Sequence, residues 1–101
     1  MSVIVIGRFH GNPTDVEAYA SGTGADVMRR LGEASRSAGA VSHRFVAGNN
    51  EFLLIDEWVD EESFQKFFAN QPDIPLAMRD AGVQGPPEFS FYRPMNTPDQ
   101  F

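Results

Sequence analysis

Two runs of apolar side chains joined by a turn are the clearest pattern in the chain. Residues 40–47 and 51–59 are rich in aromatic and branched side chains, which favour strands. Between them, Gly48, Asn49 and Asn50 tolerate the positive φ that a tight turn between antiparallel strands requires. The pattern predicts an antiparallel hairpin.

Two further strands are predicted near the ends of the chain. Residues 3–9 are apolar on both faces, because Val5 alternates with Ile4 and Ile6. Residues 88–93 follow a Gly-Pro-Pro corner and alternate phenylalanine with serine and tyrosine. Together with the hairpin, these segments predict a sheet of four strands.

Helices are predicted between the strands. Asp60 can cap a helix over residues 61–70, in which Phe64, Phe67 and Phe68 share one face. After Pro72, Asp73 is the expected N-cap of another short helix, which has Pro75 in its first turn and ends at Gly82.

Capping boxes predict two more helices before the hairpin. Thr14 with Glu17 predicts a short helix, and Thr23 with Asp26 a longer one that ends near Gly39. The apolar face expected for the longer helix consists of Val27, Leu31, Ala34 and Ala38.

The order βαββαβ is that of the ferredoxin-like α+β fold, with a four-stranded antiparallel sheet. We expect a single domain over residues 1–95 and a loose tail over residues 96–101. A chain of 101 residues has helices for one sheet face, yet its first and third strands are apolar on both. A second copy is the simplest cover, so we expect a homodimer paired through the sheet face.

Composition and charge exclude several classes of function. The net charge is −6 with one lysine, which gives no basic stripe for nucleic acid. There is no cysteine, and the two histidines lie far apart in sequence, so no metal site is expected. The first ten residues have too short an apolar run for a signal peptide or a membrane span, and a cytoplasmic location without membrane contact is the expectation.

Residues 52–68, FLLIDEWVDEESFQKFF, resemble the antibiotic biosynthesis monooxygenase-like (ABM-like) family of dimeric α+β barrels. The specific part is Glu57-Trp58 followed by an acidic helix start and a Phe-rich helix face, and the resemblance in pattern extends over residues 2–93. The family includes cofactor-free monooxygenases of polyketide aromatics, heme-degrading enzymes, isomerases, decarboxylases and members without known activity. The resemblance implies the fold and leaves the activity open.

The heme-degrading branch of this family is not supported by the residues that would bind heme. Counted from Trp58, the tryptophan of those enzymes falls on Phe67, the axial histidine on Ala77, and the first-strand asparagine on Gly7. We therefore expect no heme held in that way, and no other cofactor.

A cofactor-free monooxygenase needs an apolar cavity for a flat phenolic substrate, a base and donors that hold the resulting anion. Histidine is the side chain whose ordinary titration lies near neutral pH, which makes His43 the candidate base. Arg44 or Arg8 could stabilise the anion. The side chains expected to line the pocket are Trp58, Phe67, Phe68 and Met78.

Several of these residues also have structural interpretations. His43 could be a core or interface residue, and Trp58 could pack at a dimer edge with its indole N–H bonded to a carbonyl. Asp56 and Glu57 point to opposite faces of one strand, and we expect one to be solvated and the other to pair with an arginine. Two hypotheses follow: a homodimer that binds, or oxygenates, a small aromatic ligand, and a non-catalytic dimeric module that binds another protein.

Overall fold

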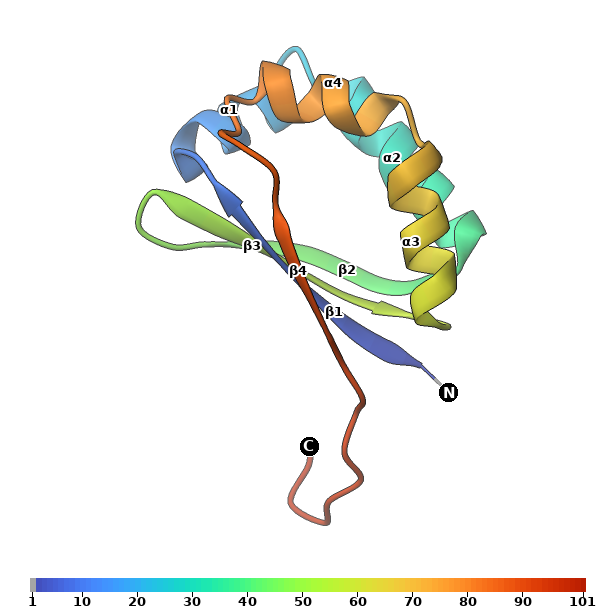
Figure 1. The fold of residues 1–101 in the computed structure, drawn as a ribbon. Coiled ribbons are helices and arrows are strands. Elements are labelled where there is room, and N and C mark those ends of the chain that lie inside the picture. Colours follow the sequence, from blue (N-terminus) through green and yellow to red (C-terminus); the bar gives the residue numbers. More distant parts are fainter. Residues whose placement is uncertain (1) are drawn as a thin grey trace.

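Four helices lie on one face of a four-stranded antiparallel sheet in the computed structural model, which describes residues 2–101 (Figure 1). The predicted α+β ferredoxin-like fold is confirmed. The elements in chain order are β1 (Val3–His10), α1 (Pro13–Ser21), α2 (Ala25–Ala38), β2 (Ala40–Ala47), β3 (Glu51–Trp58), α3 (Glu61–Asn70), α4 (Asp73–Asp80) and β4 (Glu88–Tyr92).

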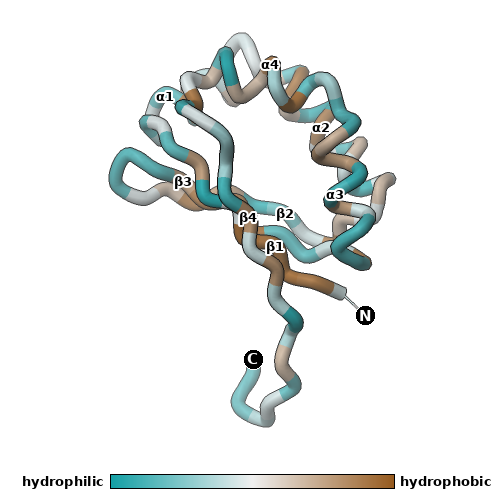
Figure 2. Tube along the Cα trace, viewed as in Figure 1, coloured by the Kyte–Doolittle hydropathy of each residue, from teal (hydrophilic) through white to brown (hydrophobic). Residues whose placement is uncertain are grey.

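The strands are arranged in the order β2-β3-β1-β4, so β1 and β3 occupy the centre of the sheet. Figure 2 shows hydrophobic residues concentrated in these two strands, whereas many residues of the helices are hydrophilic. The residues after β4 leave the sheet and run away from the helices (Figure 1).

The hairpin fixes which residues of β2 and β3 face each other. The Gly48 N–H donates to the Glu51 carbonyl at 2.8 Å, and Asn50 adopts the left-handed conformation with φ 56°. The register that follows pairs Ala47 with Phe52 and, four residues further along each strand, His43 with Asp56.

The helix N-caps differ from the prediction at three of four helices. Asn12, not Thr14, caps α1: its side chain accepts from the Thr14 N–H at 2.9 Å, and Pro13 occupies the first helical position, for which its fixed φ is suited. The N-cap of α2 is Gly24, without a side-chain hydrogen bond. The ring of Tyr19 occupies the place that a Cβ at Gly24 would need, which explains why glycine stands there.

The other two caps lie before α3 and α4. Asp60 caps α3 as predicted and accepts from the Ser63 N–H at 2.7 Å. Helix α4 begins at Asp73 itself, so Pro72 is the N-cap and the carboxylate of Asp73 lies in the first turn, where the helix dipole favours a negative charge.

The buried face of α2 is rotated from the predicted one. Ala38 is exposed, whereas Ser35 is buried and its hydroxyl donates to the Gly32 carbonyl at 2.9 Å. Ser35 is compatible with burial because this bond satisfies its hydroxyl. The face that covers the sheet therefore includes a polar residue that an apolar pattern does not reveal.

An aromatic core fills the space between helices and sheet. Val5, Phe9, Phe52, Leu54, Trp58 and Phe64 form its buried cluster. Gly7 on β1 is part of this arrangement, because a Cβ there would lie 2.7 Å from the ring of Phe89 on β4. The missing side chain of Gly7 lets that ring pack on the strand.

The other face of the sheet carries no helix among residues 2–101 (Figure 1). On this outer face the strand register pairs Ile6 of β1 with Ile55 of β3. Ile4 and Leu53 flank that pair, opposite Glu57 and Arg8, and all four apolar residues are half-buried. No helix within the described part of the chain is long and apolar enough to cross a membrane.

Candidate functional site

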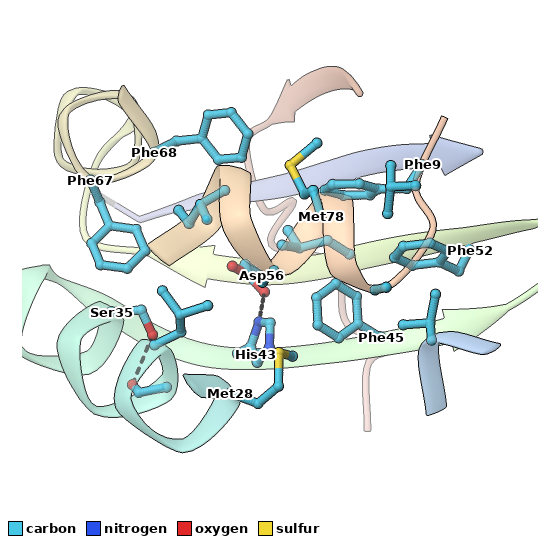
Figure 3. A pocket seen from close by; sticks show the side chains of 18 of the residues that line it. Phe9, Met28, Ser35, His43, Phe45, Phe52, Asp56, Phe67, Phe68 and Met78 are labelled. Atoms are coloured by element: carbon cyan, nitrogen blue, oxygen red, sulfur yellow. Dashed lines mark hydrogen bonds and ion pairs between the residues drawn. The ribbon is translucent and has the colours of Figure 1, made fainter. Parts of the chain in front are cut away.

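A cavity of about 150 Å³ lies between the inner face of the sheet and the helices. Its walls are almost entirely apolar and include residues from all four helices, such as Val16, Leu31, Phe67 and Met78. The few polar groups on its lining include His43 and Asp56 of the hairpin, which face each other across β2 and β3 (Figure 3). An apolar space with a few converging polar groups is the usual form of a small-molecule site.

His43 and Asp56 are joined by a short hydrogen bond. His43 Nδ1 lies 2.7 Å from Asp56 Oδ1 (Figure 3). The Asp56 residue is only 4% exposed, whereas the His43 side chain is 38% exposed. The pair therefore links a buried acceptor to a residue that solvent or a ligand can reach.

Trp58 provides a second donor to the same carboxylate. Its indole Nε1–H donates to Asp56 Oδ2 at 3.0 Å, and Trp58 itself is 1% exposed. Asp56 and Trp58 are two residues apart on β3, so both point to the inner face. Each carboxylate oxygen of Asp56 thus has its own donor, which offsets part of the cost of its burial.

This arrangement defines the chemistry available to His43. An ionised Asp56 accepts the Nδ1–H of a neutral imidazole, and this leaves Nε2 with its lone pair as a proton acceptor. When Nε2 takes up a proton, the imidazolium forms an ion pair with the same carboxylate. A histidine held in this way can accept and return a proton without changing its position.

Aromatic side chains form the rest of the wall near this pair. The His43 ring lies edge-on to Phe45, with 4.9 Å between ring centroids, and Trp58 packs against Phe64 and Phe67 at 5.5 Å each. The contacts of His43 with Phe45 and of Trp58 with Phe64 are edge-to-face, a favourable arrangement for aromatic pairs, whereas the ring of Phe67 is tilted by 45° to that of Trp58.

The structure brings together most of the residues singled out in the sequence. His43, Trp58, Phe67, Phe68 and Met78 all line the cavity. The indole N–H of Trp58 donates to the carboxylate of Asp56. The prediction that this N–H would bond to a carbonyl is therefore wrong.

The two arginines expected to stabilise an anion lie elsewhere. Arg8 and Arg44 alternate with the inward residues of β1 and β2, so they lie on the outer face of the sheet and do not line the cavity. Arg8 is 3.8 Å from Glu51, at the edge of that face. Neither arginine can contact a molecule inside the cavity as the chain is folded here.

Asp56 is a site residue that the sequence pattern did not predict. The expectation that Asp56 or Glu57 pairs with an arginine is wrong for Asp56, whose partners are His43 and Trp58. A signal for this pairing was present: counting outward from the predicted turn places Asp56 opposite His43, and two-residue alternation places it beside Trp58.

Metal ligands do not gather in the described part of the chain. Among residues 2–101, no three histidine, aspartate or glutamate side chains come close enough together to hold a metal ion. The second histidine, His10, lies outside the cavity, 3.6 Å from Glu88.

Comparisons with known proteins identify solved structures of the same fold. No protein-family model matches the sequence, and no curated protein matches it significantly. SnoaB from Streptomyces nogalater, described as a cofactor-independent oxygenase, superposes with a TM-score of 0.64 at 22% identity, covering 98% of each chain.

Two further structures are similar over nearly the whole chain. ActVA-Orf6 from Streptomyces coelicolor, a monooxygenase solved with nanaomycin D, gives a TM-score of 0.62 at 17% identity over 95% of this chain and 89% of its own. A protein described as an antibiotic biosynthesis monooxygenase superposes with a TM-score of 0.64 at 16% identity, over 93% of this chain and 99% of its own. The chain therefore has the fold of the ABM-like α+β proteins.

Proposed function

We propose that this protein binds a small aromatic molecule in the cavity between sheet and helices, and that it oxygenates a phenolic ligand there without a cofactor. The observation that carries the proposal is the His43–Asp56–Trp58 arrangement on the wall of an apolar cavity. The shared fold with SnoaB and ActVA-Orf6 supports it as an analogy, since those proteins are described as oxygenases.

In the proposed reaction, Nε2 of His43 removes the proton of a phenolic hydroxyl. The phenolate is rich in electrons and reacts with O₂, an apolar molecule that an apolar cavity admits readily. A C–O bond forms at a ring carbon, the resulting peroxide takes back the proton from His43, and loss of water leaves a carbonyl. One atom of O₂ enters the product and the other leaves as water, so phenol plus O₂ gives quinone plus water and no external reductant is consumed.

Asp56 acts as the positioning residue of this proposal. It keeps the imidazole in the tautomer with Nε2 unprotonated, and it stabilises the imidazolium that forms when the phenol is deprotonated. The imidazolium is then the positive charge nearest to the phenolate, a role for which Arg8 and Arg44 lie on the wrong face.

We also propose that two copies pair through the outer face of the sheet. Ile4, Ile6, Leu53 and Ile55 form an apolar patch there that no helix of residues 2–101 covers. Because each copy presents the same patch, pairing gives a closed symmetric dimer. The molecular mass in solution should be twice the 11.2 kDa of the chain, and Leu53→Glu should shift the protein to monomer or unfold it; a monomeric wild type overturns this part.

Oxygen consumption tests the catalytic part. Purified protein is mixed with hydroquinones and other one-ring phenols in metal-free buffer, and uptake of O₂ is compared for wild type, His43→Ala and His10→Ala. Loss of a general base lowers the rate by about 10²–10⁴-fold, so His43→Ala should fall towards the uncatalysed rate. His10→Ala is the matched control, because His10 lies outside the cavity.

Two results would contradict the assignment. Equal rates for wild type and His43→Ala exclude His43 as the base. No uptake with any phenol, in a folded protein that nevertheless binds phenols, reduces the function to ligand binding.

A further inference from the structure

A second, polar depression adjoins the cavity. This groove lies between α2 and β2, and it is lined by Arg29, Glu33, Arg36, Ser37 and Ser42 among others. Three residues, Gly32, Ser35 and His43, line both the groove and the apolar cavity. The candidate base is therefore part of the wall of both spaces.

Gly32 places no side chain where the groove and the cavity share a wall. It lies in the middle of α2, where glycine costs about 0.5–1 kcal/mol of stability relative to alanine. A Cβ built at Gly32 meets no atom within 4 Å, so packing does not require glycine at this position. Any larger side chain here would extend into the space between groove and cavity.

Arg36 provides a charge on the groove. It follows Gly32 by one helical turn, on the same side of α2. Among residues 2–101, no carboxylate lies within ion-pair distance of Arg36, whereas Arg29 is paired with Asp26 at 2.8 Å. Arg36 is thus available to an anionic group, and the polar residues Ser37 and Ser42 line the same groove.

The cavity volume limits what can be enclosed. About 150 Å³ is the size of a cavity known to hold one benzene molecule. A single aromatic ring fits this space, and a system of three fused rings does not unless the walls move. Because the lining is almost entirely apolar, an anionic substituent on the ring is excluded from the cavity and must remain in the groove.

We propose that the groove is the entrance to the cavity and that the ligand is a one-ring phenol with a carboxylate substituent, its ring enclosed by the cavity and its carboxylate held at Arg36. The phenolic hydroxyl then meets Nε2 of His43, where the two spaces join. This inference rests on the proposed function for its phenol, and it adds the size of the ligand, its charge and its route of entry.

Binding is measured through the only tryptophan of the chain, Trp58, which lines the cavity. A ring that enters the cavity should change its fluorescence. The titrations compare 2-hydroxyphenylacetate, whose hydroxyl and carboxylate lie on the same side of the ring, its neutral amide and the three-ring phenol dithranol, all without oxygen so that no turnover intervenes. The acid should bind two- to fivefold more tightly than the amide, the range of an exposed ion pair, and dithranol should not enter.

Substitutions in the groove test separately whether Arg36 recognises the carboxylate of the ligand and whether the ligand enters past Gly32. Arg36→Gln should abolish the preference for the acid, and Glu33→Gln should strengthen it by removing a nearby negative charge. Arg93→Gln, outside the groove, is the charge-matched control. Gly32→Phe should block entry and slow or abolish binding of both ligands. Ala38→Phe, at an exposed position of the same helix that lines neither space, is the matched control and should bind them as the wild type does.

Each opposite result overturns a part of the inference. Equal affinity for acid and amide, or a preference that survives Arg36→Gln, removes the charge recognition. Unchanged binding by Gly32→Phe removes the entrance, and binding of dithranol but of no one-ring phenol removes the size limit. No change in Trp58 fluorescence with any compound rejects the whole inference. Absence of oxygen uptake, in contrast, contradicts only the catalytic part of the proposed function.

Discussion

His43 Nδ1 and Trp58 Nε1 are hydrogen-bonded to different oxygens of one buried carboxylate, that of Asp56, at 2.7 and 3.0 Å. The two donors come from neighbouring strands, so the carboxylate links β2 to β3 by side chains as well as by backbone bonds. Its removal should therefore affect both the histidine and the stability of the sheet.

We first predict that Asp56 determines the tautomer of His43. In the wild type at mildly alkaline pH, the neutral imidazole should carry its proton on Nδ1, because the carboxylate accepts it. In Asp56→Asn the amide can donate as well as accept, so the Nε2–H form should become populated. Nitrogen-15 chemical shifts of the ring distinguish the two forms, and His10 serves as the internal control. An identical tautomer in both proteins contradicts the prediction.

The second prediction concerns the indole hydrogen bond. Trp58→Phe keeps an aromatic ring in the core but leaves Asp56 Oδ2 without a donor, so the free energy of unfolding should fall by about 1–3 kcal/mol. Urea unfolding followed by circular dichroism measures this loss. A double-mutant cycle with Asp56→Asn separates the hydrogen bond from the change in packing, and additive effects would show that the bond contributes nothing.

Two glycines should respond to alanine in opposite directions. Gly7→Ala places a methyl group against the Phe89 ring and should lower the free energy of unfolding by about 1–3 kcal/mol. Gly32→Ala meets open space within a helix and should raise it by about 0.5–1 kcal/mol. Chemical denaturation of the two variants beside the wild type provides the comparison. A stable Gly7→Ala would mean that Phe89 moves freely.

The cap of α3 makes stability depend on pH in a defined direction. Hydrogen bonds from the side chain and the backbone of Ser63 lower the pKa of Asp60 below its ordinary value of 3.8. The stabilisation is therefore present above pH 3.8 and is lost as pH falls through the lower pKa of the folded state. Asp60→Ala should melt at a lower temperature than the wild type at neutral pH, and the difference should shrink in acid. A difference that is constant with pH would exclude the carboxylate as its source.

Local patterns in the sequence were sufficient for the strands and for most of the helical bounds. The hairpin is encoded by its turn residues and by alternation along β2 and β3, both of which depend on neighbouring residues only. The N-cap residues were harder to predict, because several neighbouring side chains can accept a hydrogen bond from the same backbone amide. In α1, Asn12 is the cap in place of Thr14, since it precedes a proline that suits the first turn.

The candidate site was only partly predictable, for a physical reason. Apolar periodicity identified the aromatic wall at Phe67 and Phe68, since a core face and a cavity wall follow the same pattern. Apolar periodicity does not identify Asp56, because the residue is polar; only the register of the hairpin places it opposite His43, and only the structure shows that two donors accompany its burial. The position of Arg8 and Arg44 on the outer face follows from alternation alone, and applying it to the arginines would have removed them from the cavity.

Strand β2 carries His43 and lies at an edge of the sheet, with β3 as its one strand neighbour. Its ladder with β3 shifts register between Ala40 and Ser42, just before the histidine. The hydrogen bond of His43 to the buried carboxylate of Asp56 anchors this edge strand in the interior of the sheet. A ligand that draws His43 away from Asp56 should therefore release the strand and appear as faster backbone amide exchange along β2, so the mobility of this edge should report occupancy of the site.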